Sequence, residues 1–482
     1  MRAWRRYIYA RYICSVACVY SYCAQAARKG VRAVFMVAYG VACALAVPGV
    51  LNVARADDAS FRQMLEAAYL NHPQIQSQRQ ALKALDERVS QALSGWRPQI
   101  QLDYERGRKR NRFSGGPWSY VQADVRQLVI EQPLFRGGGT VASTRGAEQR
   151  VYAGRAQLLD VEQRVLSDAI AAYLGVVRTR AIVELNDANV TILGEHLRNA
   201  QLRFRVGEAT RTDVAQAQAR LASARSAARR AQGEFTAARA TFVRMAGYDP
   251  AQVLAFPHTT PALPATLEEA LRIAQIHSPQ LHSAKHAMHA AEHDVDTQVA
   301  QILPSVSLRG SMRREEGVGF FGANEADNDA LTVNVTVPIY QAGAEYARVR
   351  ESKAVWQQQK FVLIDAQHAV REEVARAWEG YLTSQTVITS YEAAIEAAHV
   401  ALEGVKKEHE FGTRTQLDVL DAEQELLEAR INLIGAQHDR WLALYGLLRT
   451  MGRLTMDVLG LDIASYAPDT HYKDVKYKMI GF

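Results

Sequence analysis

The strongest constraint on this chain is an internal duplication, in which short landmarks recur in the same order about 205 residues apart. The matched pairs are Asn71-His72-Pro73 with His277-Ser278-Pro279, Trp96-Arg97-Pro98 with Ile302-Leu303-Pro304, Gln132-Pro133-Leu134-Phe135 with Val337-Pro338-Ile339-Tyr340, Val206-Gly207 with Phe411-Gly412, and Met245-Ala246-Gly247 with Thr450-Met451-Gly452. The repeat predicts two copies of one structural unit. We place them at residues 57–256 and 265–456, with a Pro- and Thr-rich linker at 257–264 and a tail at 457–482.

Each copy contains two segments in which apolar and polar residues alternate, as a strand with two different faces requires. The run from Leu331 to Val337 alternates without exception. The pattern predicts strands near 98–110, 118–132, 304–314 and 329–339. We expect polar loops between the paired strands, at 107–117 and 315–328.

The remaining segments are predicted to be helical, and two of them are very long. No proline interrupts residues 141–204 or 344–409, and at about 1.5 Å per residue either segment could reach roughly 95 Å. Near the end of the second copy, positions 417, 420, 424, 427, 431, 434, 438, 441, 445 and 448 follow the 3-4 spacing of a coiled-coil seam, and eight of these ten are apolar. We expect the opposite face to lie in water, with Glu423, Glu425, Glu428, Arg430 and Asp439 on it.

The first 56 residues read as a leader with a secretory signal. Arg28, Lys29 and Arg32 precede an apolar run from Ala33 to Val50, and Ala54-Arg55-Ala56 offers a small-x-small cleavage site. A membrane-anchor helix is the alternative, because eighteen apolar residues can just span a bilayer. The true start is expected downstream of Met1, since a complete signal follows residue 27.

The leader also explains the charge and the cysteines. The net charge is +6, but residues 1–56 contain eight of the 57 basic residues and no acid, which leaves 49 basic against 51 acidic residues elsewhere. A basic footprint for nucleic acid is therefore missing from the rest of the chain. All four cysteines (Cys14, Cys18, Cys23, Cys43) lie in the leader, so the exported part would contain no thiol.

Four amphipathic strands cannot close a membrane barrel, which needs at least about eight strands because an open edge leaves backbone groups unpaired in lipid. If these strands cross a membrane, several chains must share one barrel. The alternative is a soluble sheet packed on the helices. Alternating polar residues suit the wall of a water-filled pore better than such a sheet.

The sequence from Ser60 to Gly452 resembles the TolC family of outer-membrane factors. The resemblance rests on Val337-Pro338-Ile339-Tyr340-Gln341-Ala342-Gly343, on Phe411-Gly412-Thr413-Arg414-Thr415 leading to Asp418-Val419-Leu420-Asp421, and on the duplicated helix–strand–strand–helix order. It implies a mainly α-helical fold with a β-barrel contribution: a homotrimer with a shared twelve-stranded barrel in the outer membrane and a long coiled-coil tunnel in the periplasm. It also implies a periplasmic adaptor and an inner-membrane ABC transporter or other pump as partners.

The resemblance assigns roles to residues near the closed end of the tunnel. Asp418 and Asp421 are one turn apart and would form a gate and selectivity ring of six carboxylates in a trimer; the alternative is an exposed acidic helix face. Arg414 is expected to reach Thr212, and His409 to reach Asp213. His409 stands where the family has a phenol, and a charged imidazole would hold Asp213 more tightly, which predicts a lower conductance below about pH 6. The tips expected to dock an adaptor are Gly207, Arg211, Gly412 and Thr415, and the strand-to-helix turns are Pro133, Gly138, Pro338 and Gly343.

Two other motifs are weaker candidates for binding sites. Gly137-Gly138-Gly139 precedes a helix, but no Gly-Lys-Ser/Thr follows, so we interpret it as a turn rather than a phosphate cradle. His282, His286, His289 and His293 share a helix face with a spacing that could bind a metal. The first copy lacks these histidines, and a solvated or tunnel-lining stripe is the simpler interpretation.

The sequence therefore predicts a passive export channel without catalytic residues, metal or cofactor. The cargo remains open between a polypeptide, as in type I secretion of toxins, and small molecules such as drugs. The missing lipid-anchor cysteine weakly favours protein export. The competing class is a periplasmic coiled-coil scaffold without a pore.

Overall fold

A computed structural model describes residues 49–112, 115–250, 254–320 and 323–481. The chain divides into two compact units, Met1–Ala59 and Ser60–Phe482. Most of the predicted leader lies outside the described residues, and its last eight residues belong to helix α3 (Gly49–Asn71). The second unit contains both copies of the repeat.

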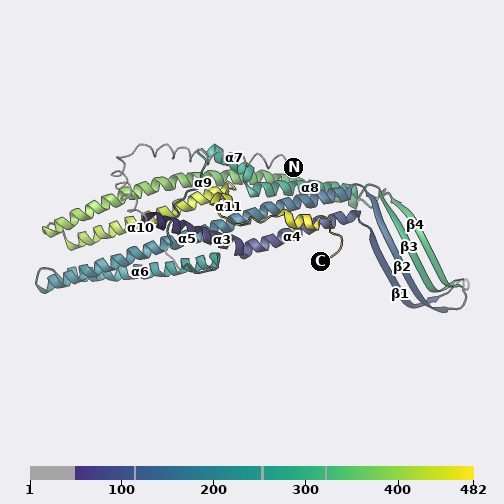
Figure 1. Ribbon diagram of the computed structural model, residues 1–482, viewed down its shortest axis with the longest axis horizontal. Coiled ribbons are helices and arrows are strands. Elements are labelled where there is room, and N and C mark those ends of the chain that lie inside the picture. The colour runs from purple at the N-terminus through teal and green to yellow at the C-terminus, as the bar shows by residue number, and fades with distance from the viewer. Residues whose placement is uncertain (1–48, 113–114, 251–253, 321–322, 482) are drawn as a thin grey trace, which may run out of the picture. The chain divides into compact units, whose positions relative to one another are not determined.

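The second unit repeats one order of elements: helices, a strand pair, a very long helix and a shorter helix (Figure 1). In the first copy these are the end of α3, α4 (Pro73–Leu93), η2 (Ser94–Trp96), β1 (Gln99–Asn111), β2 (Ser119–Arg136), α5 (Gly139–Arg205) and α6 (Arg211–Ala246). In the second they are α7 (Leu267–His277), α8 (Pro279–Ala300), β3 (Ser305–Phe320), β4 (Ala323–Thr336), α9 (Ala344–Glu410) and α10 (Gln416–Thr450), followed by α11 (Met456–Leu459) and α12 (Asp469–Val475). Helices α5 and α9 have 67 residues each, about 100 Å of continuous helix.

The four strands form one antiparallel sheet in the order β1-β2-β3-β4, at one end of the helices (Figure 1). The two hairpins, far apart in sequence, pair through β2 and β3 in a register that sets Ile130 opposite Gly310. Within the chain β1 and β4 are the edge strands. The predicted fold class, mainly helical with four amphipathic strands, is confirmed.

The predicted polar loops are too long. Residues 107–111 belong to β1, and the ladder between β3 and β4 continues through Glu315 opposite Ala326 and Glu316 opposite Glu325. Backbone hydrogen bonds do not depend on side-chain polarity, and cross-strand pairs such as Arg314–Asp327 at 3.6 Å accommodate charge on the sheet. The change from alternating to charged sequence therefore marks a change in the strand's surroundings, and the strand itself continues.

The turn between strand and long helix has the same geometry in both copies. Gly138 and Gly343 are the N-cap residues of α5 and α9, with φ of 81° and 82°, a region that side chains with a Cβ rarely adopt. Pro133 lies in β2 beside a register shift, and Pro338 lies between β4 and α9. Gly138, Pro338 and Gly343 thus lie between strand and helix, whereas Pro133 lies within β2, which continues to Arg136.

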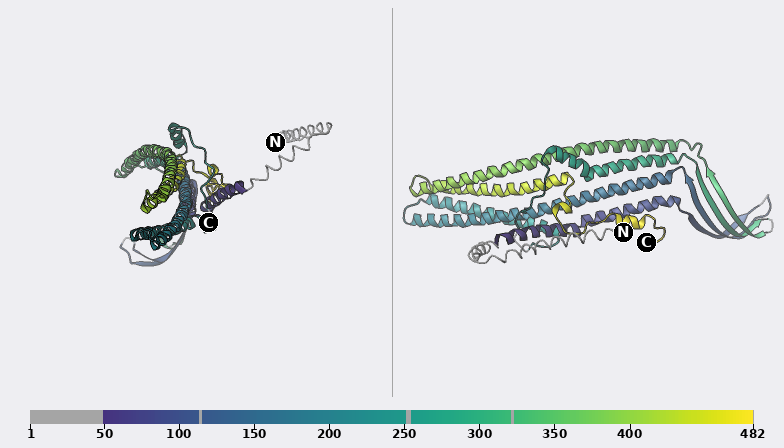
Figure 2. Two further views of the ribbon diagram at one scale, coloured as in Figure 1. Left: turned by 90° about the vertical axis from the view of Figure 1, so that its left-hand side faces the viewer. Right: turned by 45° about the horizontal axis from the view of Figure 1, so that its top comes forward.

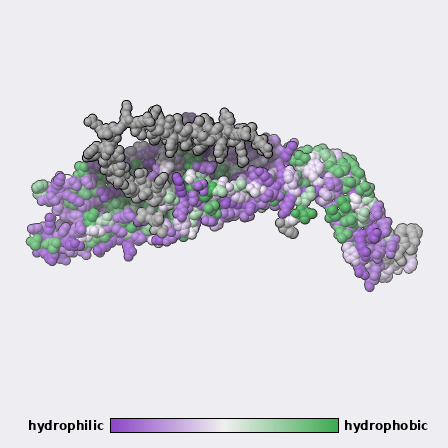
Figure 3. Space-filling model, in the orientation of Figure 1, coloured by the Kyte–Doolittle hydropathy of each residue, from purple (hydrophilic) through white to green (hydrophobic). Residues whose placement is uncertain are grey.

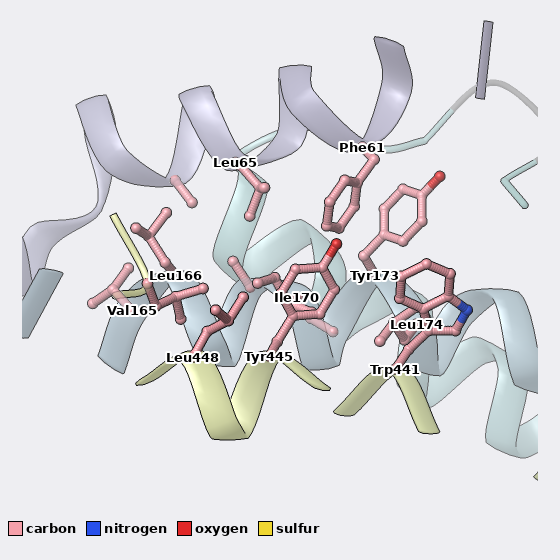
Figure 4. Packing of buried hydrophobic residues seen from close by; sticks show 14 of the residues in the cluster. Phe61, Leu65, Val165, Leu166, Ile170, Tyr173, Leu174, Trp441, Tyr445 and Leu448 are labelled. Carbon is pink, nitrogen blue, oxygen red and sulfur yellow. The ribbon is translucent and has the colours of Figure 1, made fainter. Parts of the chain in front are cut away.

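The main hydrophobic core joins both copies. Tyr173 of α5 is fully buried, and its ring meets the edge of Phe61 with ring centroids 5.0 Å apart (Figure 4). From the second copy, Tyr445 and Leu448 of α10 pack on the same cluster (Figure 4). Helices α5 and α10 therefore lie side by side through their apolar faces.

The tail after α10 packs on the first copy through α12 and α4. Asp469 pairs with Arg155 at 2.6 Å, His471 contacts the buried carboxylate of Asp86 at 3.1 Å, and burial raises the pKa of that carboxyl above its usual value. The tail is thus an ordered part of this unit. Separately, none of the described helices combines enough length with enough apolar residues to cross a membrane.

The two copies provide a matched glycine pair for testing the packing. Gly247 and Gly452 both follow a helix with φ of 79° and 71°. A Cβ on Gly452 would lie 2.3 Å from the carbonyl oxygen of His277, whereas Gly247 has open space. Both alanine variants incur roughly 1 kcal/mol of backbone strain. We expect Gly452→Ala to lose about 1–3 kcal/mol more, because backbone must move. Thermal denaturation followed by circular dichroism checks this, and equal losses would contradict the packing.

Candidate gate at the helical hairpin tips

The α5–α6 and α9–α10 hairpins end in five-residue loops built in the same way, at 206–210 and 411–415. Two residues after the end of each long helix lies a glycine with positive φ, 84° at Gly207 and 79° at Gly412. The next N–H closes the helix end: Glu208 donates to Arg203 at 2.9 Å, and Thr413 donates to Glu408 at 3.0 Å. This pattern satisfies the last carbonyls and reverses the chain within a few residues.

The returning helices begin with identical capping boxes. Thr210 and Asp213 cap α6, and Thr415 and Asp418 cap α10. The hydroxyl and the backbone N–H of Thr415 donate to Oδ2 of Asp418 at 2.7 and 2.8 Å. These hydrogen bonds lower the pKa of Asp418 below its usual value, so the carboxylate is charged. The sequence analysis predicted only a gate role for Asp418 and missed its capping role, although Thr-x-x-Asp before an apolar run resembles a capping signal.

The second predicted gate residue, Asp421, has a different environment. Its side chain is half exposed and pairs with Arg220 of α6. Asp418 and Asp421 lie one turn apart at the start of α10, so the structure places the two carboxylates near the same tip. Asp421 also connects the second hairpin to the first, a contact that the sequence did not suggest.

The predicted fastening residues contact other partners within the chain. Arg414 donates from Nε to Glu408 at 2.9 Å, and His409 contacts the Arg414 carbonyl through Nδ1 at 3.0 Å. The other ring nitrogen of His409 lies 3.4 Å from Arg203 of the first hairpin. Asp213 is engaged by Thr210. Among the hydrogen bonds of the described residues, neither Arg414 with Thr212 nor His409 with Asp213 occurs, so both contacts stay predictions.

A buried carboxylate, Glu423, joins three helices above the tips. His196 of α5 contacts it through Nε2 at 3.0 Å, and Lys406 of α9 contacts it through Nζ at 3.0 Å. Gln416 holds the other nitrogen of His196 at 3.1 Å. Burial acts to raise the pKa of Glu423, but hydrogen bonds from His196 and Lys406 outweigh it and lower the pKa below its usual value.

The prediction that Glu423 lies in water is therefore wrong. Its side chain is only 8% exposed. Val419 and Leu426 are buried too, so the buried stripe of α10 at this level runs at i, i+4 and i+7 from Val419 and includes Glu423. That spacing was a signal in the sequence, but the acidic residue type argued against burial.

An apolar cluster beside Glu423 also connects the two hairpins. Leu420 of α10 is buried against Leu193 of α5 and against Leu221 and Ala224 of α6. The polar contacts at Glu423 and Asp421 thus sit on either side of a small packed core. Together they join the hairpins above their exposed tips, and moving one hairpin away from the other would break all three.

The histidine stripe on α8 is divided among separate partners. His282 contacts the Ile276 carbonyl at 2.7 Å, His286 contacts Gln149 at 2.8 Å, and His289 contacts Glu292 at 3.2 Å. His293 lies 3.6 Å from Asp296. Over the part of the chain that the structure describes, no group of three or more His, Cys, Asp or Glu is arranged to hold a metal ion.

Comparisons with known proteins agree on one family. The family model described as outer membrane efflux protein matches residues 64–248 and 270–453. The chain is 33% identical over 447 residues to the outer membrane efflux protein BepC of Brucella suis, covering 92% of this chain and 96% of BepC. It is 24% identical to the alkaline protease secretion protein AprF of Pseudomonas aeruginosa, covering 80% and 83%. The structure of the outer membrane protein VceC of Vibrio cholerae matches with a TM-score of 0.72 at 20% identity, covering 82% and 96%.

The lowered pKa of Glu423 makes the join between the hairpins pH-dependent. A carboxyl whose pKa is lower in the folded state stabilises the fold fully at pH values above its unfolded pKa of about 4.5. This stabilisation is lost as the pH falls through the lower pKa of the folded state. We expect Glu423→Ala to lose about 1–3 kcal/mol at pH 7, since the largely buried His196 and the exposed Lys406 both lose their acceptor. The difference from wild type should shrink below about pH 4. Melting curves at several pH values measure it, with the exposed Glu425→Ala as the control; equal losses for the two variants would refute the role of Glu423.

Proposed function

The chain belongs to the outer membrane efflux protein family, and from this premise we propose that three copies assemble into one export duct through the outer membrane and periplasm. Proteins of this family are outer-membrane channels and not enzymes. The main observation that supports the proposed trimer is that the sheet is open at both edges. A four-stranded sheet with free edges at β1 and β4 would leave backbone groups unpaired in lipid, so other copies must pair them.

The faces of the sheet support a membrane location. Ile100, Leu102 and Leu331 point to one face and are 69%, 74% and 75% exposed. Their neighbours in sequence, such as Gln101 and Thr332, point to the other face. An apolar outer face and a polar inner face are the pattern of a water-filled barrel.

Helix α9 supplies a second surface for assembly. Val355, Phe361, Val362 and Ile364 lie along it with exposures between 43% and 69%. In the views of Figure 2, α9 lies at the margin of the helical layer. Apolar side chains exposed on a marginal helix suit packing against a neighbouring copy, which would extend the layer into a closed tunnel.

We assign the closed end of the duct to the hairpin tips. Six carboxylates from Asp418 and Asp421 of three copies would favour cations. The contacts at Asp421 and Glu423 would hold the hairpins in the closed arrangement. The apolar tip residues Val206 and Phe411, 71% and 84% exposed, lie beside Gly207, Arg211, Gly412 and Thr415 and offer a docking surface to a periplasmic adaptor, which would connect an inner-membrane ABC transporter or other pump.

For the cargo, we propose efflux as the leading role. The 33% identity with BepC, named an efflux protein, covers almost the whole chain. Protein secretion, the role favoured by the sequence alone, is the second candidate, supported by the similarity to AprF. Deleting the gene separates them: increased sensitivity to toxic small molecules with unchanged secreted protein favours efflux, and the reverse result favours secretion.

The gate predicts a conductance phenotype. Arg220→Ala combined with Glu423→Ala removes two of the polar contacts between the hairpins, Arg220–Asp421 and His196–Glu423. We therefore expect a several-fold rise in single-channel conductance in planar bilayers, because the hairpins separate more easily. Arg180→Ala, which removes an exposed pair with Glu184 higher on α5, is the control and should conduct like wild type.

Two results would contradict this account. Unchanged conductance of the double variant would show that these contacts do not hold the gate closed, but it would not contradict the proposed duct. Purified wild-type protein that stays monomeric in detergent and never conducts would contradict the proposed duct itself.

A further inference from the structure

The outward face of the sheet changes from apolar to charged once along every strand, at a position that shifts by four residues from β1 to β4. Figure 3 shows the apolar band next to the helices and the hydrophilic end beyond it. Moving away from the helices, the last apolar outward residues and their charged successors are Tyr104 then Arg106, Leu128 then Arg126, Met312 then Arg314, and Leu331 then Asp329. In the ladder these positions are staggered, because Tyr104 pairs with Arg126 and Leu331 pairs with Gly310. A flat membrane boundary crosses tilted strands obliquely in this way.

Beyond this boundary the two edge strands carry opposite charges on the same face. Strand β1 presents Arg106, Arg108 and Arg110, and all three are at least partly exposed. Strand β4 presents Glu325, Asp327 and Asp329, and these are exposed as well. Both rows follow the two-residue period of a strand, and the register of the sheet assigns both to the outward face.

These charges are largely unpaired within the chain. Asp327 lies 3.6 Å from Arg314, and Arg110 lies over the ring of Trp118, 4.1 Å from its centroid. Among the described residues, Arg314 is the one oppositely charged side chain that forms an ion pair with any of the six. Two rows of three charges thus remain at opposite edges of one sheet, without a neighbouring strand on the outer side.

We propose that these rows meet across the seam between copies, so that the basic row of β1 lies beside the acidic row of β4 from a second copy. This rests on the proposed trimer and adds to it which residues meet. In the register that we assign to this seam, Tyr104 pairs with Leu331, so that Arg106 lies opposite Asp329, Arg108 opposite Asp327, and Arg110 opposite Glu325. Strands β1 and β4 run in opposite directions, as this antiparallel pairing requires.

The charge arrangement also selects the kind of assembly. Opposite charges on neighbouring strands stabilise their pairing, whereas like charges directly opposite each other oppose it. Two β1 edges would bring arginines together, and two β4 edges would bring carboxylates together. A head-to-tail contact between β4 and β1 is therefore favoured over a two-fold pair, and repeated head-to-tail contacts close into a ring.

Charge reversal tests the seam in the full-length protein. We expect R106E/R108E/R110E to lose most of its detergent-resistant trimer, and E325K/D327K/D329K to do the same. Combining all six changes restores opposite charges and should restore the trimer, which a folding defect would not. Arg126→Glu, on the same face of the central strand β2, is the matched control and should remain trimeric.

The outcomes separate the seam from the duct. A wild-type trimer that survives both reversals, or that the combined variant fails to recover, overturns the charged seam and leaves the trimer standing. Wild-type protein without any trimer overturns the proposed function as well. Recovery in the combined variant, after loss in both reversals, supports the seam.

Disulfide trapping tests the register independently, because all four native cysteines lie within residues 1–56. Arg108→Cys with Asp327→Cys should give covalent oligomers under oxidation, seen after heating without reductant. Arg108→Cys with Thr336→Cys places the second thiol far along β4 and should not. Assembled trimers in which the first pair fails to cross-link, or in which both pairs do so equally, would overturn the register.

Discussion

Backbone hydrogen bonds at the two edges of the sheet are the constraint on which the architecture depends. Water can satisfy an exposed edge, but lipid cannot. Strands β1 and β4 are both open in the single chain, and the apolar outer face beside them indicates lipid. The proposed assembly of several copies follows from that combination, and the long helices would continue the same arrangement as a tunnel. The duplication supplies two hairpins of strands and two hairpins of helices from one structural unit.

The two copies keep their backbone geometry and differ in their side-chain contacts. Gly207 and Gly412 close the long helices alike, and the capping boxes of Asp213 and Asp418 start the returning helices alike. Contacts between the copies are different in kind. Glu423 has no acidic counterpart in the first copy, and it binds His196 across the hairpins. Duplication therefore supplied the frame, and divergence supplied the contacts that join its halves.

The same physical effect acts at both ends of the molecule. At the tips, the ion pair of Asp421 with Arg220 and the contact of Glu423 with His196 hold the two hairpins of one chain together. At the far end of the sheet, the arginines of β1 and the acids of β4 are proposed to hold neighbouring chains together. In both places the two signs of charge lie on different elements. Only the correct neighbouring element therefore offers the matching charge.

The sequence by itself determined the duplication, the strand and helix order, and the turns, since periodicity and glycine or proline positions are local properties that survive in any surroundings. It located Gly138 and Gly343 and the tips at Gly207 and Gly412 for this reason. It could not locate Glu423 or the Arg220–Asp421 pair, because their partners on the first hairpin lie more than 200 residues away and depend on how two hairpins pack. It also ended β3 too early and began β4 too late, since a charged residue can continue a ladder once a partner strand is present. Only the tertiary structure decided which charges are buried and which meet, because burial and ion pairing depend on neighbours that a linear pattern does not specify.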